Sequence, residues 1–489
     1  MKETGILLAL SSLPSPCGVG DLGEAAFRWV DLLAENGVTV WQLLPLNPLG
    51  YGNSPYLPDS SFAGDEVYIS LDTLAREGLL EQVPEALSLS PGKAHYAAVR
   101  RWKEPWLRRA WRSYRPEEDF RRFCDQPWVQ NYGVFCALKK ENGGRSWTDW
   151  PAEQRDWPTC HTMDLSPLED EIQYRMFLQY LFARQWGLLR DYAHARGVRL
   201  MGDLPFYVGA DSADVWANRA QFLLREDGRP AFVAGVPPDS FSSTGQRWGS
   251  PLYDWTEMEA EGFSFWVSRV GYAGALFDLI RLDHFLGMDC YWQIPAACPT
   301  AVEGSWQKAS GERLLEMLHR EVPGLRLVAE DLGVQTPGMQ ALKDRFGLMG
   351  MKIFQYDLYL DKKRPVLWPD PAAHQIFYTG THDNATLREW YLSRTVPQRR
   401  KLRKWLKRQG QSQGSPCQGI IRTMLESPCE LVIFPLADLM ELEGEARMNL
   451  PGTVGSPNWE WRLIAFPPAA AALRRFRPQI MKRKEESPC

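Results

Sequence analysis

The sequence predicts an α/β fold, a (β/α)₈ barrel of the TIM type, and three observations support this prediction. Eight short apolar runs recur along the 489 residues, and each of them ends in a polar cluster containing Gly, Pro, Asp or Asn. Amphipathic helical stretches lie between most of these runs. Strands that alternate with helices form parallel sheets, and eight such units close into a barrel.

The eight runs are the predicted strands. In chain order they are GILLALSS from Gly5, VTVWQLLPLNPLG from Val38, VRLMGDLP from Val198, LFDLIRLDHF from Leu276, LRLVAEDLG from Leu325, GMKIFQYD from Gly350, QIFYTGTHDN from Gln375 and LVIFPLADL from Leu431. Residues 24–37 and 171–197 are the clearest amphipathic helices between them. The first helix is expected to stop at Gly37, because glycine favours helix ends.

Two gaps are too long for a simple connection between a strand and a helix. Residues 65–170, after strand 2, are rich in Trp, Arg and Glu and predict an inserted, mainly helical subdomain. Residues 206–256, after strand 3, end in a stretch of Gly, Pro, Ser and aromatic residues and predict an inserted, loop-rich lid. We therefore expect one catalytic barrel over residues 1–466 and a C-terminal tail over 467–489, with a frayed end.

The composition excludes several classes of protein. A net charge of −4 gives no reason to expect binding to nucleic acid or to an anionic membrane. We find no signal peptide and no apolar run of spanning length, and the nine cysteines lack metal-type spacing, so a reduced, cytoplasmic protein is expected. Most of the 21 Trp, 21 Phe and 17 Tyr must form core, but aromatic faces also suit sugar rings.

Polar side chains follow four of the predicted strands, where barrel enzymes place their catalytic groups. An acid just past a strand is more often a helix cap or a loop ligand. Several acids at one barrel mouth carry a desolvation cost that function explains better than structure does. The candidates are Asp203 after strand 3, Arg281, Asp283 and His284 after strand 4, Glu330 after strand 5, and His382 and Asp383 after strand 7.

Strand 4 gives the most specific prediction. Alternation places Arg281 and Asp283 on the same face, so the guanidinium would keep Asp283 ionised, as a nucleophile must be. A structural salt bridge is the alternative for this motif taken alone. Glu330, near that charge and under a lid, should have a raised pKa, which suits a general acid. Two carboxyl groups roughly 5 Å apart would give a retaining double displacement through a glycosyl-enzyme.

Long, ordered motifs extend over nearly the whole chain, from SSLPSPCGVGDLG at Ser11 to EARMNLPGTVGSPNWEWR at Glu445. Between them stand GNSPY from Gly52, GVPPDSFSSTGQRWG from Gly235, RLDHF from Arg281, AEDLGV from Ala329 and YTGTHDN from Tyr378. With these motifs the chain resembles the 4-α-glucanotransferase family, also called amylomaltase or disproportionating enzyme, glycoside hydrolase family 77.

The resemblance implies catalytic roles for residues in those motifs. Asp283 matches the nucleophile, Arg281 the residue that supports it, and Glu330 the acid/base. Asp383 matches the stabiliser of the transition state, and His382 matches its neighbour on the same sugar.

The resemblance also implies substrate-binding residues. Tyr56 matches a ring under the −1 sugar, Asp203 a substrate-site aspartate, and Trp248 an aromatic residue over the acceptor side. For Tyr56 or Trp248 without the resemblance, core packing would be the better interpretation. The remaining substrate-binding candidates in these motifs are Asp239, Phe241 and Asn384.

The implied activity is the transfer of α-1,4-glucan segments to the 4-hydroxyl of an acceptor. The expected partners are donor and acceptor glucans; we expect no cofactor, no metal, and a monomer or weak homo-oligomer. Three single residues and one short stretch depart from the family pattern: Ala385 after THDN, Leu57 after SPY, Ala9 in place of an early His, and AGDE at 63–66. These departures leave the preferred glucan length open.

Three other functions would explain part of the sequence. A metal-dependent barrel hydrolase or isomerase would need more ligands, since only His284 and His382 of the seven histidines lie at the mouth and no HxH pair occurs. A non-catalytic glucan-binding protein would explain the aromatic residues but not the paired acids. An α-glucan hydrolase is the nearest alternative, because the same acids serve both reactions.

Overall fold

The computed structural model describes residues 2–238, 242–360, 366–367 and 370–486. Within these residues the predicted barrel is confirmed: eight parallel strands lie in the order β10–β13–β14–β1–β2–β3–β6–β9. A bridge between Val328 and Met349 closes the ring. The strands are β1 (Glu3–Leu7), β2 (Val40–Gln42), β3 (Arg199–Leu204), β6 (Leu279–Leu282), β9 (Leu327–Ala329), β10 (Gly350–Ile353), β13 (Gln375–Tyr378) and β14 (Leu431–Pro435).

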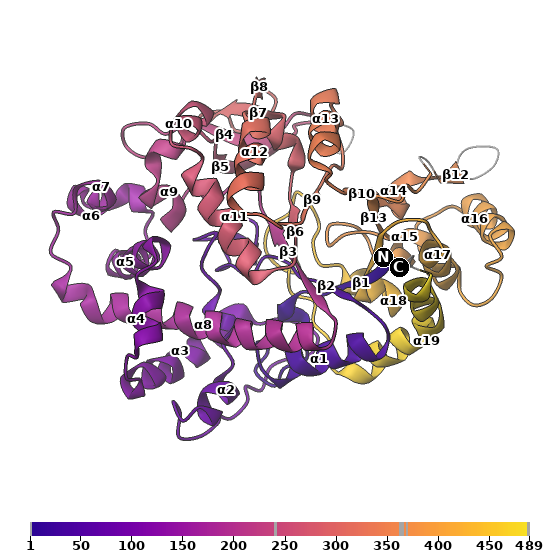
Figure 1. Cartoon of the computed structure of the whole chain (residues 1–489), viewed down its shortest axis with the longest axis horizontal. Coiled ribbons are helices and arrows are strands. Elements are labelled where there is room, and N and C mark those ends of the chain that lie inside the picture. Colours follow the sequence, from indigo (N-terminus) through magenta and orange to yellow (C-terminus); the bar gives the residue numbers. More distant parts are fainter. Residues whose placement is uncertain (1, 239–241, 361–365, 368–369, 487–489) are drawn as a thin grey trace.

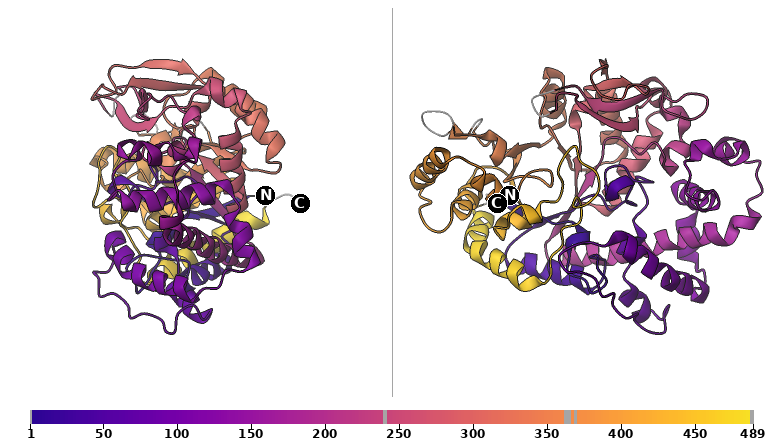
Figure 2. Two further views of the ribbon diagram at one scale, coloured as in Figure 1. Left: turned by 90° about the vertical axis from the view of Figure 1, so that its left-hand side faces the viewer. Right: turned by 180° about the vertical axis from the view of Figure 1, so that it is seen from behind.

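Helices surround this sheet (Figures 1 and 2). The two helices expected at 24–37 and 171–197 are α1 (Glu24–Glu35) and α8 (Glu169–Ala195). The other helices between and after the barrel strands are α11 (Ser264–Leu276), α12 (Gly311–Glu321), α13 (Pro337–Phe346), α14 (Phe354–Asp357), α15 (Leu387–Leu392), α16 (Val396–Arg408), α17 (Pro416–Leu425), α18 (Leu436–Leu439) and α19 (Phe466–Glu485).

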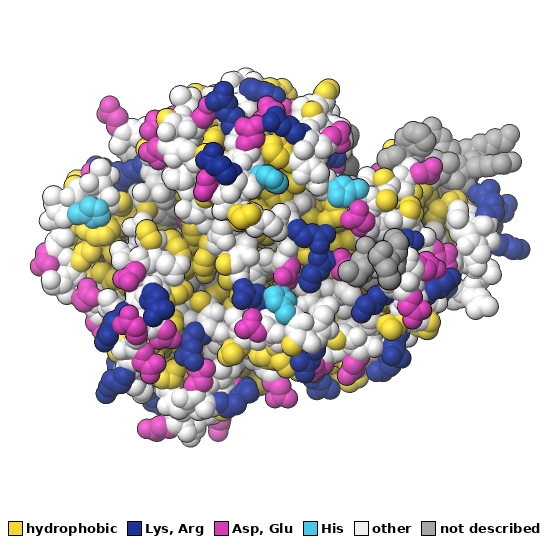
Figure 3. Space-filling model, viewed as in Figure 1, with side chains coloured by type: hydrophobic (Ala, Val, Ile, Leu, Met, Phe, Trp, Pro, Cys, Tyr) yellow, Lys and Arg dark blue, Asp and Glu magenta, His cyan; other side chains and the backbone are white. Residues whose placement is uncertain are grey.

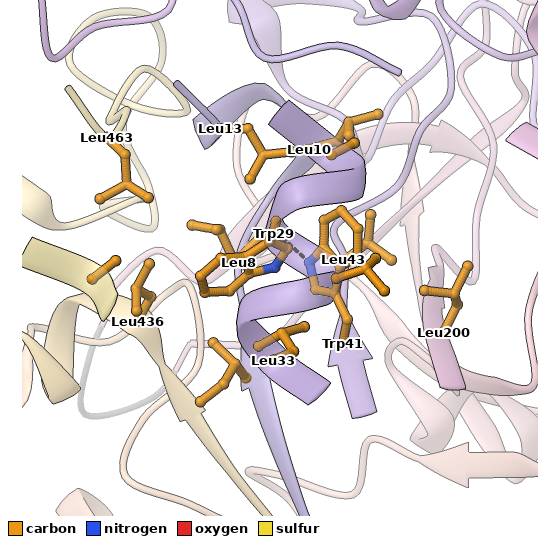
Figure 4. Packing of buried hydrophobic residues seen from close by; sticks show 14 of the residues in the cluster. Leu8, Leu10, Leu13, Trp29, Leu33, Trp41, Leu43, Leu200, Leu436 and Leu463 are labelled. Carbon is orange, nitrogen blue, oxygen red and sulfur yellow. Dashed lines mark hydrogen bonds between the residues drawn. The ribbon is translucent and has the colours of Figure 1, made fainter. Parts of the chain in front are cut away.

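The packing of α1 shows how the apolar pattern of the sequence builds the core. Its buried residues include Trp29 and Leu33, which lie on one face because they are four positions apart. Trp29 meets Trp41 of β2 edge to face, with ring centroids 6.5 Å apart. The Trp41 indole N–H donates to the Leu8 carbonyl at 2.8 Å, so the buried polar atom is satisfied (Figure 4). These contacts hold α1 against β2, and β2 against the residue that follows β1.

The segment 65–170 is largely helical, and its longer helices lie around α8 (Figure 1). Helix α5 packs along α8. Helix α3 contains Pro105 in its interior and still runs over 18 residues. The helices are α2 (Leu71–Arg76), α3 (Tyr96–Ser113), α4 (Glu118–Cys124), α5 (Pro127–Glu141), α6 (Ala152–Arg155) and α7 (Trp157–Cys160).

The segment 206–256 contributes to a second, antiparallel sheet. It carries α9 (Ala213–Ala217), β4 (Phe232–Val236), β5 (Gln246–Pro251) and the start of α10 (Trp255–Ala260). Strand β4 pairs with β5 and with β7 (Cys290–Pro295), and β7 pairs with β8 (Ser305–Lys308). Half of this sheet therefore comes from the chain after β6. A small hairpin, β11 (Leu358–Tyr359) and β12 (Val366–Leu367), follows α14.

The expectation of a frayed C-terminal end is wrong for residues 482–485, which complete α19. Arg483 is buried and donates to the carbonyls of Glu3 at 3.1 Å, of Leu425 and Ser427 at 2.9 Å, and of Cys429. These acceptors come from distant parts of the chain. The sequence around the basic residues 482–484 therefore gives no local sign that Arg483 is buried. Helix α19 is thus bound to the seam between β1 and the segment that leads into β14.

The surface carries charges of both signs. In Figure 3 acidic and basic side chains are interspersed over the visible face. Within the described ranges, the structure contains no helix with the length and hydropathy needed to cross a bilayer.

Candidate active site

Arg281 lies at the centre of the charged groups at the carboxyl ends of the strands. Its Nη1 donates to both oxygens of Asp203, at 2.7 and 2.9 Å, and its Nη2 lies 2.8 Å from Oδ1 of Asp283. The Asp203 side chain is fully buried, whereas that of Asp283 is 28% exposed. The predicted pair of Arg281 and Asp283 is therefore present, and the open carboxylate faces the mouth of the barrel.

Asp283 and Glu330 are neighbours because β6 and β9 are paired. In this register Leu282 lies opposite Ala329, so the next residue on each strand is one of the two acids. Burial raises the pKa of Glu330 to about 7; the Arg281 charge opposes this rise and the Asp283 charge adds to it. The raised pKa agrees with the sequence prediction, while the separation of roughly 5 Å stays a prediction.

Two backbone N–H groups hold the Glu330 carboxylate. After β6 the chain takes a left-handed conformation at His284, with φ of 50°, and the N–H of this residue donates to Oε2 at 2.8 Å. The N–H of Leu332 donates to Oε1 at 3.0 Å. A non-glycine residue in the left-handed region is uncommon and often marks a functional site. Here the turn fixes the direction of the carboxyl group.

Asp383 stays ionised because of its partners. Burial alone would raise its pKa, but His382, with Nε2 3.4 Å from Oδ2, and the amide of Asn449, 2.6 Å from Oδ1, lower it to about 2. Arg447 binds the Asp383 carbonyl at 2.8 Å. The site therefore holds one carboxylate that is charged at all ordinary pH values beside Glu330, which titrates near neutrality.

Tyr56 connects the loop after β2 to the loop after β13. Its hydroxyl donates to Oδ2 of Asp203 at 2.8 Å, and its ring stacks on His382 with centroids 5.2 Å apart and an interplanar angle of 23°. Trp459 completes this aromatic group, 5.6 Å from Tyr56. Tyr56 is only half-buried, so it lines the site and does not belong to the closed core.

Trp248 lies over the end of β6, carried by strand β5 of the antiparallel sheet. Its ring meets the His284 ring edge to face, with centroids 4.8 Å apart, and its N–H donates to the Gln246 side chain at 3.2 Å. Burial lowers the pKa of His284 to about 4, so this imidazole is neutral at ordinary pH.

Two further substrate-binding candidates from the sequence, Asp239 and Phe241, lie outside the residues that the structure describes.

Asn384 shapes the loop that carries His382 and Asp383. Its Oδ1 accepts hydrogen bonds from the Thr381 N–H at 2.8 Å and from the Thr381 hydroxyl at 3.0 Å, so the carbonyl end of its amide is engaged within the loop. Its expected contact with substrate stays a prediction.

Among the described residues, no group of three or more His, Cys, Asp or Glu side chains lies close enough together to hold a metal ion.

Asp438 holds both ends of the same loop. It accepts from the Thr379 hydroxyl at 2.6 Å and from the Leu387 N–H at 2.7 Å, and burial raises its pKa to about 7. Sequence reasoning missed this residue, and it assigned no role to Asn449 or Trp459. Asn449 and Trp459 lie in the motif EARMNLPGTVGSPNWEWR, and this motif was the sequence feature that could have indicated them.

A model of the protein family described as 4-alpha-glucanotransferase matches residues 8–466. The chain belongs to the 4-α-glucanotransferase family. The 4-alpha-glucanotransferase of Thermus thermophilus is 43% identical over 477 residues, which cover 95% of each protein. The chloroplastic/amyloplastic 4-alpha-glucanotransferase of Solanum tuberosum is 38% identical over 480 residues, covering 94% of this chain and 82% of the relative.

A solved structure agrees with this assignment. The amylomaltase from Streptococcus agalactiae in complex with acarbose superposes with a TM-score of 0.91 at 30% identity, covering 99% of both chains.

Asp65 and Glu66, which depart from the family pattern, have a structural role in this 4-α-glucanotransferase. Both carboxylates pair with Arg100, and Asp65 also accepts a hydrogen bond from the Val67 N–H at 2.9 Å.

Proposed function

We propose that this chain transfers segments of α-1,4-glucan, such as maltooligosaccharides or fragments of starch or glycogen, to the 4-hydroxyl of an acceptor glucan. The reaction is a retaining double displacement. One observation carries the proposal: Asp283, paired with Arg281, and Glu330, with a pKa of about 7, end adjacent strands at the barrel mouth. Membership of the 4-α-glucanotransferase family supports this substrate class.

In the first step, the Asp283 carboxylate attacks the anomeric carbon of the −1 sugar. The bond from this carbon to the leaving 4-oxygen breaks, and the Glu330 carboxyl gives its proton to that oxygen. A pKa of about 7 leaves enough Glu330 protonated near neutral pH for this role. Arg281 orients Asp283, because its Nη2 lies 2.8 Å from Oδ1 of that carboxylate.

In the second step, the Glu330 carboxylate takes the proton of the acceptor 4-hydroxyl. The acceptor oxygen attacks the anomeric carbon, the ester bond to Asp283 breaks, and the nucleophile is restored. Two inversions at this carbon retain its α configuration. Both steps use only side chains of this chain.

The remaining groups position the −1 sugar and stabilise the charge that develops on it. The half-buried face of Tyr56 offers an apolar surface for the ring, and the buried Trp459 packs beside it. Asp383, ionised through His382 and Asn449, lies at the same mouth and would stabilise positive charge at the anomeric centre. Asp203 orients the Tyr56 hydroxyl and the Arg281 guanidinium, so we assign it a positioning role.

Transfer must outcompete attack by water on the glycosyl-enzyme. Water is abundant, so the acceptor has to be held in place and water kept away from the ester; positioning is worth effective molarities up to roughly 10⁵–10⁸ M in ideal cases. Trp248 is placed for this task, because it lies over the strand that ends in Asp283 and is only half-buried.

The test is incubation with maltotriose, analysed by chromatography of the products beside an assay of reducing ends. Transfer conserves the number of glycosidic bonds, so we expect glucose and a ladder of longer maltooligosaccharides with almost no gain in reducing ends. Reducing ends that rise in step with the consumption of maltotriose would identify a hydrolase and overturn the proposal.

We also propose that the protein works in the cytoplasm, without nucleic acid or a membrane, as a monomer or weak homo-oligomer. The net charge of −4 and the free state of every cysteine that the structure describes support this. As to domains, we propose one catalytic barrel with insertions at 65–170 and 206–256, in which α19 belongs to the barrel because it packs on β1.

A further inference from the structure

A groove lies outside the barrel mouth, between α5, α9, α11 and the loop after β2. It has a volume of about 400 Å³ and is open to solvent. This volume falls within the usual range of small-molecule sites, roughly 300–1,000 Å³. In Figure 1, α5 and α9 lie to the left of α11, away from the strand ends that carry Arg281 and Asp283. None of the residues assigned to the active site lines the groove.

Aromatic rings form the apolar part of the groove. The rings of Phe62 and Trp128 stack, with centroids 5.9 Å apart and an interplanar angle of 16°, and Tyr272 lies 4.9 Å from Trp128. Trp128 and Tyr272 are half-buried, so part of each ring stays open. The Trp128 N–H is already bound to the Gln126 side chain at 3.2 Å. What remains available is the flat apolar face, which suits the face of a sugar ring.

Hydrogen-bonding groups without partners surround these rings. The side chains of Asn131, Ser264 and Ser268 line the groove and form no hydrogen bond within the part of the chain that the structure describes. An amide offers donors and an acceptor, and each hydroxyl offers both. These groups match a ligand that is rich in hydroxyls, and such ligands are recognised by a few polar groups set around an apolar surface.

The described part of the groove lining also presents no cationic side chain. Among the described residues that line it, none is Lys or Arg, and the carboxylate present is that of Asp214. Its Oδ2 accepts the Ser61 N–H at 2.6 Å and its Oδ1 accepts from the Ser60 hydroxyl at 3.5 Å, so it is engaged within the protein. A phosphate or another anion would find no charged partner here. An uncharged, polyhydroxylated ligand fits.

We propose that this groove binds a second segment of α-1,4-glucan, apart from the segment at the barrel mouth. The proposal rests on the function proposed above, since it takes the donor polymer itself as the ligand. Phe62 lies six residues after Tyr56 on the same loop, and the Ala213 N–H donates to the Asp59 carbonyl at 2.8 Å, which ties α9 to that loop. The groove and the sugar platform of the active site are therefore held on connected backbone.

A glucan long enough to reach both places binds in two contacts, and the second contact benefits from the high local concentration that the first creates. Maltotriose is too short to gain from this. The groove should therefore lower the KM for long glucans and leave the reaction of maltotriose unchanged.

The test uses Trp128→Ala and Asn131→Ala, each measured in two assays. Binding is measured by retardation in gels that contain amylose, on the inactive Asp283→Asn background so that the polymer stays intact. Kinetics are measured in the active protein with amylose and with maltotriose. We expect each variant to weaken amylose binding and to raise the KM for amylose, by about tenfold for Trp128→Ala, with unchanged maltotriose kinetics.

Trp306→Ala is the matched control, because Trp306 is 42% exposed on β8 and does not line the groove; it should behave like the parent. Trp128 packs on Phe62, so its loss could affect folding, whereas Asn131→Ala removes only polar contacts. Native retardation in both variants would overturn the proposal. That outcome differs from failure of the proposed function, which would show as hydrolysis of maltotriose by the unmodified protein.

Discussion

Asp203 and Asp283 share the guanidinium of Arg281. Nη1 binds both oxygens of the buried Asp203, and Nη2 binds the more exposed Asp283 at 2.8 Å. One cation thus neutralises a carboxylate that water cannot reach and also orients the proposed nucleophile. Loss of the cation should therefore have two separable effects, one on folding and one on catalysis.

The first prediction concerns folding. Arg281→Met leaves the Asp203 charge buried without its cationic partner, so we expect it to lower the free energy of unfolding by about 3–5 kcal/mol. The double variant Arg281→Met/Asp203→Asn removes that charge and should recover part of the loss. Urea unfolding of both variants measures the difference. Equal destabilisation in the two variants would show that the unpaired Asp203 charge is not the cause.

The second prediction concerns the nucleophile. Asp283→Asn keeps the size of the side chain and removes its charge, so the fold should persist while the rate falls by several powers of ten, about 5 kcal/mol or more. Activity and thermal melting are measured together. The control is Asp344→Asn, an exposed residue on α13 that should change neither property. Turnover near the native rate would rule out Asp283 as the nucleophile.

The third prediction separates the acid role of Glu330 from its base role. Glu330→Gln should abolish reaction with maltotriose, because the leaving sugar oxygen needs a proton. Formation of the glycosyl-enzyme from an α-glucosyl fluoride should survive, because fluoride leaves with little protonation. The burst of fluoride release measures that step, and the later transfer should stay slow. A burst reduced as much as the maltotriose rate would contradict the acid role.

The fourth prediction is a pH profile. Glu330 must be protonated at the start of the first step, and its pKa lies at about 7, so kcat/KM for maltotriose should be full below that pH and fall as the pH rises through 7. Asp383, with a pKa of about 2, stays ionised throughout and adds no limb. Initial rates between pH 5 and 9 test this. In Glu330→Gln with the fluoride donor, the limb near 7 should be absent.

The fifth prediction concerns the choice between transfer and hydrolysis. Trp248→Ala removes the aromatic face that we propose for the acceptor side, so transfer should weaken more than hydrolysis, because water does not depend on that face. The ratio of ladder products to new reducing ends measures this. Trp248→Phe keeps an aromatic ring and should restore most of the native ratio. An unchanged ratio in Trp248→Ala would remove this residue from acceptor binding.

The sequence predicts the barrel well because the barrel is built from local patterns. Each strand is a short apolar run, and α1 shows its helical spacing directly. Helix α8 is instead buried at every position from 176 to 182, so it has no single apolar face. The antiparallel sheet was not predicted, because β4 and β7 pair across nearly 60 residues and β4 contains Gly235. Such pairing depends on tertiary contacts that a local pattern does not encode.

The same limit applies to the site. Arg281 lies in β6 and Asp283 directly follows that strand, so alternation alone predicts that they meet. Asn449 reaches Asp383 from 66 positions away on an irregular segment, and nothing in its local sequence marks it as a partner of that carboxylate. The bond between Arg281 and Asp203 is partly predictable from sequence. Both residues lie near the ends of strands, but which strands are neighbours is known only from the strand order of the closed sheet.

The hydrogen bonds of Arg483 on α19 mean that the barrel can be completed only late in translation. Strand β1 is synthesised before the other barrel strands, yet its neighbour β14 and the guanidinium that binds the Glu3 carbonyl come more than 400 residues later. During translation the growing sheet therefore has one unpaired edge on β1, open to other partners. We expect the nascent protein to need shielding of that edge until α19 has emerged, when Lys2 and Glu486 form an ion pair 3.9 Å apart.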